Sequence, residues 1–148
     1  MRWLERHSQA LQALGALLTA VFALVALLGV KLQLDTTERI SREAQARDIY
    51  RSYLSLSINT PQFASPGQCP SFNETELGAY YTYVEYLLYT AEQVTAMDAS
   101  WAETFEVALS DHLAFICTED DWNGYTDEVA ALIRRTQAAN CADRPICG

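Results

Sequence analysis

The sequence predicts an all-α protein in which an N-terminal transmembrane helix continues into a small four-helix bundle. Residues 11–30 contain only two polar side chains, Gln12 and Thr19. After them, apolar residues recur at three- and four-residue steps, and no stretch alternates as a β-strand would. A chain of 148 residues is long enough for one span and a single bundle with a buried core.

Residues 11–30 are predicted to cross a membrane after a short tail over residues 1–10. Twenty helical residues rise about 30 Å, the thickness of the hydrocarbon core of a bilayer. A cleaved signal peptide is the alternative, because Arg2 and Arg6 precede the apolar run. However, the apolar core of a signal peptide is typically about 7–15 residues, and residues 26–31 lack small side chains at both key cleavage positions. We therefore favour an uncleaved anchor over a signal peptide or a buried core helix.

The helix is expected to continue past the span, because residues 31–59 contain no Gly or Pro. Residues 9–58 would then form one rod of about 75 Å. Residues 31–45 are charged on most faces and predict a solvated helical stalk. An apolar stripe begins near Ala46, so residues 46–140 are assigned to an acidic helical bundle and residues 141–148 to a Cys-containing tail.

Local signals divide the bundle into helices. Pro61, Pro66 and Gly67 lie in a predicted loop from about residue 60 to residue 72. The next helix begins at a capping box, Asn73 with Glu76, and ends near residue 97. A second box, Ser100 with Glu103, predicts a helix to about residue 116, and Thr126 is expected to cap the last one. Ten side chains are expected to be buried: Tyr50, Leu54, Tyr81, Val84, Leu88, Phe105, Leu109, Ile116, Val129 and Ile133.

The charge of the bundle is one-sided. The chain carries a net charge of −9, and between Ser52 and Ile133 there are thirteen acidic residues and no Lys or Arg. Such a surface repels nucleic acid and anionic lipid head groups, and it favours a basic partner or cations. The alternative interpretation is solubility or adaptation to a salty medium.

The segment 119–130 resembles a calcium-binding loop in part. Counting Glu119 as position one places Asp121 at three, Asn123 at five and Asp127 at nine. Position twelve is Ala130 instead of the bidentate Glu, so these four residues are only weak calcium candidates. A turn followed by an acidic helix N-terminus explains the same residues. We accordingly expect no cofactor.

Tyrosines and one histidine are the remaining polar candidates. Tyr53, Tyr50, Tyr80 and Tyr81 are expected in the core, and Tyr83 and Tyr86 at an exposed or interfacial position. An aromatic ligand pocket is the alternative. His112 shares an apolar stripe, which favours a buried histidine bonded to a tyrosine or a carbonyl over a general base or a partner of a Cys117 nucleophile.

All four cysteines follow the span. An even number suits two disulfides in an oxidising compartment, with unpaired thiols or a zinc site as alternatives. Antiparallel helices would bring Cys69 near Cys117, and Cys141 and Cys147 lie close in sequence. We therefore expect Cys69–Cys117 and Cys141–Cys147 bonds and a domain outside the cytoplasm. Lys and Arg are nearly balanced around the span, so they do not decide its orientation.

Four segments carry a family resemblance: residues 47–54, 59–64, 83–94 and 112–117. With them, the chain resembles a group of uncharacterised bacterial proteins that have one membrane span and a helical domain. The resemblance implies this architecture but no activity and no catalytic residue. The expected location is the cell inner membrane, with a single pass.

The leading functional hypothesis is a membrane-anchored interaction or regulatory module without catalytic activity. Small residues at three- and four-residue steps could bind a protein partner or a second copy within the membrane: Ala13, Ala16, Ala20 and Ala23. An Ala-rich composition explains them equally well. A sensor that binds a small ligand or a cation through its Tyr-rich and acidic surface is the alternative function. An enzyme ranks third, because no nucleophile, base and oxyanion donor converge.

Overall fold

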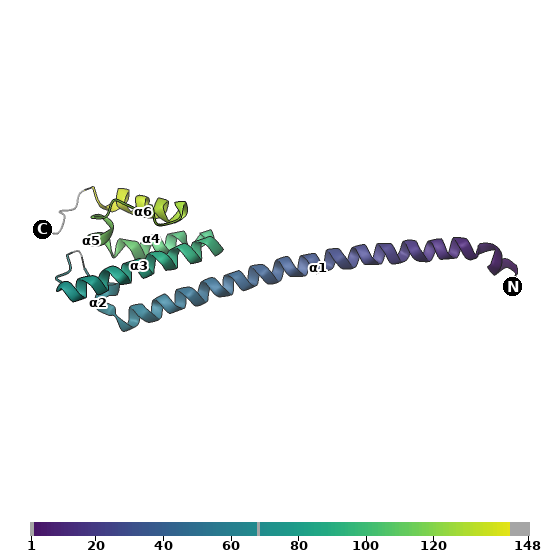
Figure 1. Cartoon of the computed structure of the whole chain (residues 1–148), viewed down its shortest axis with the longest axis horizontal. Helices are drawn as coiled ribbons and strands as arrows, with labels where there is room; N and C mark the ends of the chain where they lie inside the picture. The colour runs from purple at the N-terminus through teal and green to yellow at the C-terminus, as the bar shows by residue number, and fades with distance from the viewer. Residues whose placement is uncertain (1, 68, 143–148) are drawn as a thin grey trace. The chain divides into compact units, whose positions relative to one another are not determined.

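The computed structural model describes residues 2–67 and 69–142, with residues 2–11 described as backbone only. All the regular elements in these ranges are helical, which confirms the all-α prediction. The elements are α1 (Arg2–Asn59), α2 (Pro61–Ala64), α3 (Glu74–Met97), the 3₁₀ helix η1 (Ala99–Trp101), α4 (Ala102–Ser110), α5 (Leu113–Ile116) and α6 (Asp127–Asn140) (Figure 1). They fall into two compact units, Met1–Ser41 and Arg42–Gly148.

The first unit consists of the N-terminal part of α1. From residue 12 on, where side chains are described, its large apolar side chains are all exposed: Leu14, Leu17, Leu18, Val21, Phe22, Leu24, Val25, Leu27, Leu28, Val30, Leu32, Leu34 and Ile40. Its most apolar window has a mean hydropathy of 2.5, and none of that window is buried. This helix is therefore long and apolar enough to cross a membrane. The helix also continues without a break through Ser57, as predicted from the lack of Gly and Pro.

Helix α3 is central to the second unit, where it contacts η1, α4 and α6. Its first turn has the predicted capping box. The Glu76 N–H donates to Asn73 Oδ1 at 3.0 Å, and the Asn73 N–H donates to Glu76 Oε2 at 3.0 Å. The core of this unit includes Ala46 of α1, Val84, Leu87, Leu88, Ala91 and Val94 of α3, Phe105 and Leu109 of α4, and Val129, Leu132 and Ile133 of α6.

The predicted helix from Ser100 to Ile116 is wrong in two ways. Asp98 caps the chain instead of Ser100, because Asp98 Oδ1 accepts the Ser100 N–H at 2.9 Å and begins the 3₁₀ turn. The helix also breaks between α4 and α5, where His112 leaves helical geometry (φ −113°, ψ 30°). Packing of the His112 ring against two tyrosine rings accompanies this break, and no local sequence signal marks it.

The loop predicted between residues 60 and 72 contains the short helix α2. Phe63 of α2 is buried and packs edge to face against Phe72, with ring centroids 5.5 Å apart. The chain then turns through Gly67, whose φ of 76° suits glycine because it has no Cβ. The loop thus contributes to the core instead of only connecting two helices.

The expected burial is wrong for three of the ten side chains. Tyr81 is 45% exposed and Leu54 is 41% exposed, while Tyr50 is half-buried. Tyr83, expected at an exposed or interfacial position, is buried instead. On α3 the buried face includes Tyr80, Leu87 and Leu88, and Tyr81 lies at its edge, about 100° from Tyr80. The remaining seven side chains are buried, as predicted.

Candidate functional site

Three hydroxyl groups meet where the end of α1 packs against α3. The Tyr83 and Ser57 hydroxyl oxygens lie 2.6 Å apart, and the Tyr83 hydroxyl donates to the Tyr53 oxygen at 3.3 Å. We call Tyr53, Ser57 and Tyr83 the hydroxyl cluster. Burial raises the pKa of Tyr53, and the hydrogen bond from Tyr83 raises it further. Tyr53 is therefore uncharged at neutral pH.

His112 lies beside this cluster in the core. Its Nδ1 is 3.3 Å from the Tyr80 hydroxyl, and its ring packs against Tyr80 and Tyr83 with centroids 5.8 and 5.6 Å away. The side chain has no exposed surface, and burial lowers its pKa to about 4. The predicted buried histidine bonded to a tyrosine is thus confirmed. Its Nε2 has no hydrogen-bond partner among the described residues.

Two grooves flank the hydroxyl cluster. The α1–α3 groove has a volume of about 380 Å³ and is lined by Leu56, Thr60, Phe63, Ala79, Thr82, Tyr83 and Tyr86. All of these side chains are uncharged. Tyr86, expected at an interface, is half-buried here, whereas Tyr83 lines the groove from its buried position.

The α1–α4 groove lies on the other side of the cluster and has a volume of about 460 Å³. Helix α1 contributes Tyr50, Tyr53, Leu54 and Ser57, and α4 with its C-cap contributes Thr104, Val107, Ala108 and Asp111. Because Tyr83 lines one groove while Tyr53 and Ser57 line the other, their hydrogen bonds separate the two. The α4 wall is not predicted by the sequence. Its only local signal was Val107, an apolar residue off the inward stripe of its helix.

The acidic residues remain at the surface. None of the thirteen carboxylates between Ser52 and Ile133 is buried. Two of them make contacts between helical elements: Glu92 Oε1 accepts the Thr126 N–H at 2.8 Å, and Glu106 lies 3.9 Å from Arg135. The prediction that the Thr126 side chain caps α6 is wrong, because this side chain forms no capping hydrogen bond. Glu92 of α3 instead accepts the backbone N–H of Thr126. The other carboxylates give this unit a negative field.

The weak calcium candidates hydrogen-bond within their own loop. Glu119 Oε1 accepts the Asp121 N–H at 3.3 Å, and Asp121 Oδ1 accepts the Asn123 N–H at 3.0 Å. Asp127 begins α6 in its first turn. No group of three or more potential ligands that could hold a metal is found in the described part of the chain. The buried Trp122 packs against Phe115 and attaches this loop to the core.

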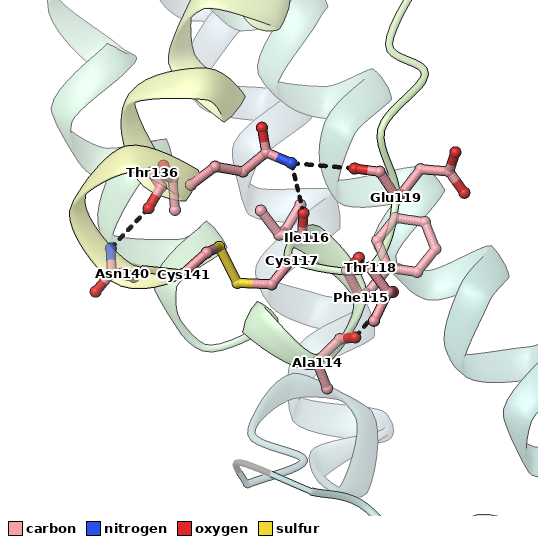
Figure 2. Close-up of a disulfide and its surroundings, with 10 residues drawn as sticks. Ala114, Phe115, Ile116, Cys117, Thr118, Glu119, Thr136, Asn140 and Cys141 are labelled. Carbon is pink, nitrogen blue, oxygen red and sulfur yellow. Dashed lines mark hydrogen bonds between the residues drawn. A yellow bond between two sulfur atoms is a disulfide. The ribbon is translucent and has the colours of Figure 1, made fainter. Parts of the chain in front are cut away.

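Cys117 and Cys141 form a disulfide, with Cα atoms 5.6 Å apart (Figure 2). Both predicted pairs, Cys69–Cys117 and Cys141–Cys147, are therefore wrong. The bond joins the end of α5 to the end of α6, since these helices pack together. Cys69 is disulfide-bonded as well, and Cys147 lies outside the described residues. A disulfide sulfur is not a thiolate, so Cys117 does not act as a nucleophile in this state.

Gln137 reinforces the same end of the unit. Its Nε2 donates to the Ile116 carbonyl at 2.8 Å and to the Glu119 carbonyl at 3.0 Å. Asn140 Nδ2 donates to the Thr136 carbonyl at 3.0 Å next to the disulfide (Figure 2). The start of the segment between α5 and α6 is therefore held by covalent and polar contacts to the end of α6.

The small residues proposed as an interface remain exposed on α1. Ala13, Ala16, Ala20 and Ala23 all have accessible side chains. Their role in binding a partner or a second copy stays a prediction.

No family model matches the chain, and comparisons with curated proteins and with solved structures find no match either.

Proposed function

We propose that this protein is a membrane-anchored, non-catalytic binding module that presents an acidic helical domain to a partner. One observation carries the proposal: the most apolar stretch of α1 is entirely exposed, whereas the second unit has its own buried core. Each large apolar side chain of this stretch would gain about 1.5–3 kcal/mol by leaving water. A contiguous apolar surface of this extent is rare on a soluble monomer and is typical of a membrane contact.

The polar groups of the stretch are compatible with hydrocarbon. The Thr19 hydroxyl donates to the Gly15 carbonyl at 2.9 Å within the same helix, so it needs no water partner. Backbone groups of an α-helix are likewise satisfied inside the helix. The exposed Ala13, Ala16, Ala20 and Ala23 could allow another helix to approach closely, which supports a protein partner or a homo-oligomer within the membrane.

The disulfide supports a domain outside the cytoplasm. Structural disulfides persist in oxidising compartments and are rare where glutathione keeps thiols reduced. The Cys117–Cys141 bond connects two helices of the core and is flanked by Gln137 contacts, which is typical of a structural bond. On this basis the acidic unit faces the oxidising side of the membrane.

The charge of the second unit supports a basic partner. The thirteen carboxylates between Ser52 and Ile133 are all at least partly accessible, and no Lys or Arg lies in that stretch to neutralise them. Such a field accelerates association with a cationic surface and disfavours anionic ones, including nucleic acid.

Membrane fractionation tests the anchor. The full chain should remain in the membrane pellet after an alkaline carbonate wash, and Leu17→Arg with Leu24→Arg should release it, because each Arg costs about 3 kcal/mol near a span centre. Ile58→Arg with Thr75→Arg adds the same charge at exposed positions of the second unit and should leave the wild-type distribution unchanged. Extraction of the wild type by carbonate, or a mature N-terminus located after residue 30, would overturn the proposal.

Topology is tested on the same preparations. Protease added to intact spheroplasts should digest the second unit if it lies outside the cytoplasm. Protection until the membrane is permeabilised would place it inside and contradict this part of the proposal.

A sensor for a small neutral ligand is the second candidate function. The uncharged α1–α3 groove favours it, since a volume of about 380 Å³ with aromatic walls resembles small-molecule pockets in size and chemistry. A neutral aromatic probe such as menadione should then raise the melting temperature, and Ala79→Leu should remove the effect. Stabilisation by calcium alone would instead indicate a cation sensor.

A further inference from the structure

The α1–α4 groove has the geometry of a helix-binding site. Its two long walls are Tyr50 to Ser57 of α1 and Thr104 to Asp111 at α4, and Ala64 of α2 also lines it. Each long wall spans eight residues, whose seven steps rise about 10 Å or two helical turns. Lining residues recur at three- and four-residue steps on both walls, so each helix presents one continuous face to the groove.

The rims of this groove are apolar but accessible. Val107 is 66% exposed on α4, and Leu54 is 41% exposed on α1. Neither side chain contributes to the core cluster. Two accessible aliphatic residues on opposite walls of a groove would gain stability from an apolar helix placed between them.

Asp111 is the only charged residue that lines the groove. It is the C-cap of α4, where the helix dipole is negative and a cation is favoured. In the described part of the chain, no ion pair and no hydrogen bond involves its carboxylate. The adjacent His112 does not neutralise it, because burial holds the pKa of that ring at about 4. A cation placed here would be attracted both by the carboxylate and by the negative end of α4.

We propose that the α1–α4 groove binds an amphipathic helix of a partner protein, with a Lys or Arg of that helix paired to Asp111 and its apolar side chains between Leu54 and Val107. The proposal rests on the proposed function as a binding module and names the surface and the chemistry of the partner. Charge complementarity selects this occupant. A second copy of the chain carries the same net charge of −9 and would be repelled, and a small cation would leave the rims uncovered.

Peptide binding to the full chain in an uncharged detergent tests the proposal. The probe is a fluorescent amphipathic helical peptide with leucines on one face and a single lysine at the centre of that face. Its twin carries norleucine in place of this lysine, and anisotropy in empty micelles is subtracted for both. Asp111→Asn should weaken binding of the lysine peptide by about tenfold, the usual size for a hydrogen-bonded charge pair. The norleucine peptide should bind wild type and Asp111→Asn alike.

Two further variants are controls: one tests whether the position of the lost charge matters, and the other tests the apolar contact. Asp120→Asn removes the same charge from an exposed loop position and should change affinity for the lysine peptide less than twofold. Val107→Ser should weaken both peptides, because it removes apolar contact without touching the charge. Both sites are exposed, so neither substitution disturbs the core.

Four results would overturn this proposal. Equal weakening by Asp111→Asn and Asp120→Asn would indicate general attraction to an acidic surface, and no effect of Val107→Ser would place the peptide elsewhere. Self-association of the full chain that Val107→Ser abolishes would assign the groove to a second copy. Stabilisation by benzyltrimethylammonium without peptide binding would assign it to a small cation. Each of these leaves the anchor intact, so carbonate fractionation separates failure of this inference from failure of the proposed function.

Discussion

The hydroxyl oxygens of Ser57 and Tyr83 lie 2.6 Å apart although the two residues are twenty-six positions apart in sequence. This contact joins the last turns of α1 to the middle of α3, and it forms part of the wall between the two grooves. Tyr53 extends it by accepting from Tyr83 at 3.3 Å. The end of α1 is thus attached to the core by polar contacts as well as by ring packing against Trp101 and Phe105 through Tyr50.

Removal of the Tyr83 hydroxyl should lower stability by about 1 kcal/mol. Tyr83→Phe keeps the ring in the core but deprives Ser57 and Tyr53 of their shared partner, and a net intramolecular hydrogen bond contributes about 0.5–1.5 kcal/mol. Urea unfolding of the full chain in detergent measures the change. Tyr89→Phe is the matched control, because Tyr89 is 56% exposed and should be neutral. A neutral Tyr83→Phe would show that the hydroxyl cluster contributes nothing to holding α1.

A cavity at Leu109 should be far more costly. Leu109 has no exposed surface and belongs to the core cluster, so Leu109→Ala should lower the free energy of unfolding by about 2–5 kcal/mol. Val107→Ala, two residues away on the same helix but 66% exposed, should cost less than about 0.5 kcal/mol. Similar losses for the two variants in urea unfolding would contradict the assigned inner face of α4.

The disulfide should stabilise the second unit measurably. Cys117 and Cys141 are separated by 24 positions, and in the chain-entropy model a loop of this length is worth about 3.5 kcal/mol. Cys117→Ser should therefore lower the melting temperature without abolishing helical signal. Peptide mapping without reductant should recover a linked peptide that contains Cys117 and Cys141. Recovery of a Cys69–Cys117 peptide instead would show that the pairing is wrong.

Acid should destabilise the fold through His112. Burial lowers the pKa of this residue from its ordinary 6.5 to about 4 in the folded state, so the unfolded chain binds the proton more tightly. Stability therefore falls as the pH drops from about 6.5 to about 4, by roughly 3 kcal/mol from this group, and is unaffected by it above that window.

The pH dependence is measured by urea unfolding at several pH values in wild type and His112→Gln. Carboxylates titrate in both proteins, so the difference between their curves isolates the histidine. The wild type should lose more stability than His112→Gln between pH 6.5 and pH 4. Parallel curves would mean that the ring is protonated as easily in the folded chain as in the unfolded one.

The sequence alone determined the features that depend on neighbours three or four positions apart. Three features are of this local kind: the Asn73–Glu76 box, the Gly- and Pro-containing segment after α1, and the run of apolar residues in α1. Each depends on a contact within one helical turn or on the preference of the residues themselves. Such local interactions do not depend on how the helices pack, so the all-helical class and most helix boundaries could be predicted from the sequence. The buried histidine was likewise indicated by its place in an apolar stripe.

Tertiary structure decided which face of each helix is covered and which distant residues meet. Tyr81 and Tyr83 are both aromatic and two positions apart, and only packing against α1 and α2 selects Tyr83 for the core. The break at His112, the Cys117–Cys141 pair and the groove at Asp111 depend in the same way on how α4, α5 and α6 are placed. These contacts join residues that are far apart in sequence, so the spacing of apolar residues within one helix does not predict them. The free energy that stabilises them comes from burial between helices.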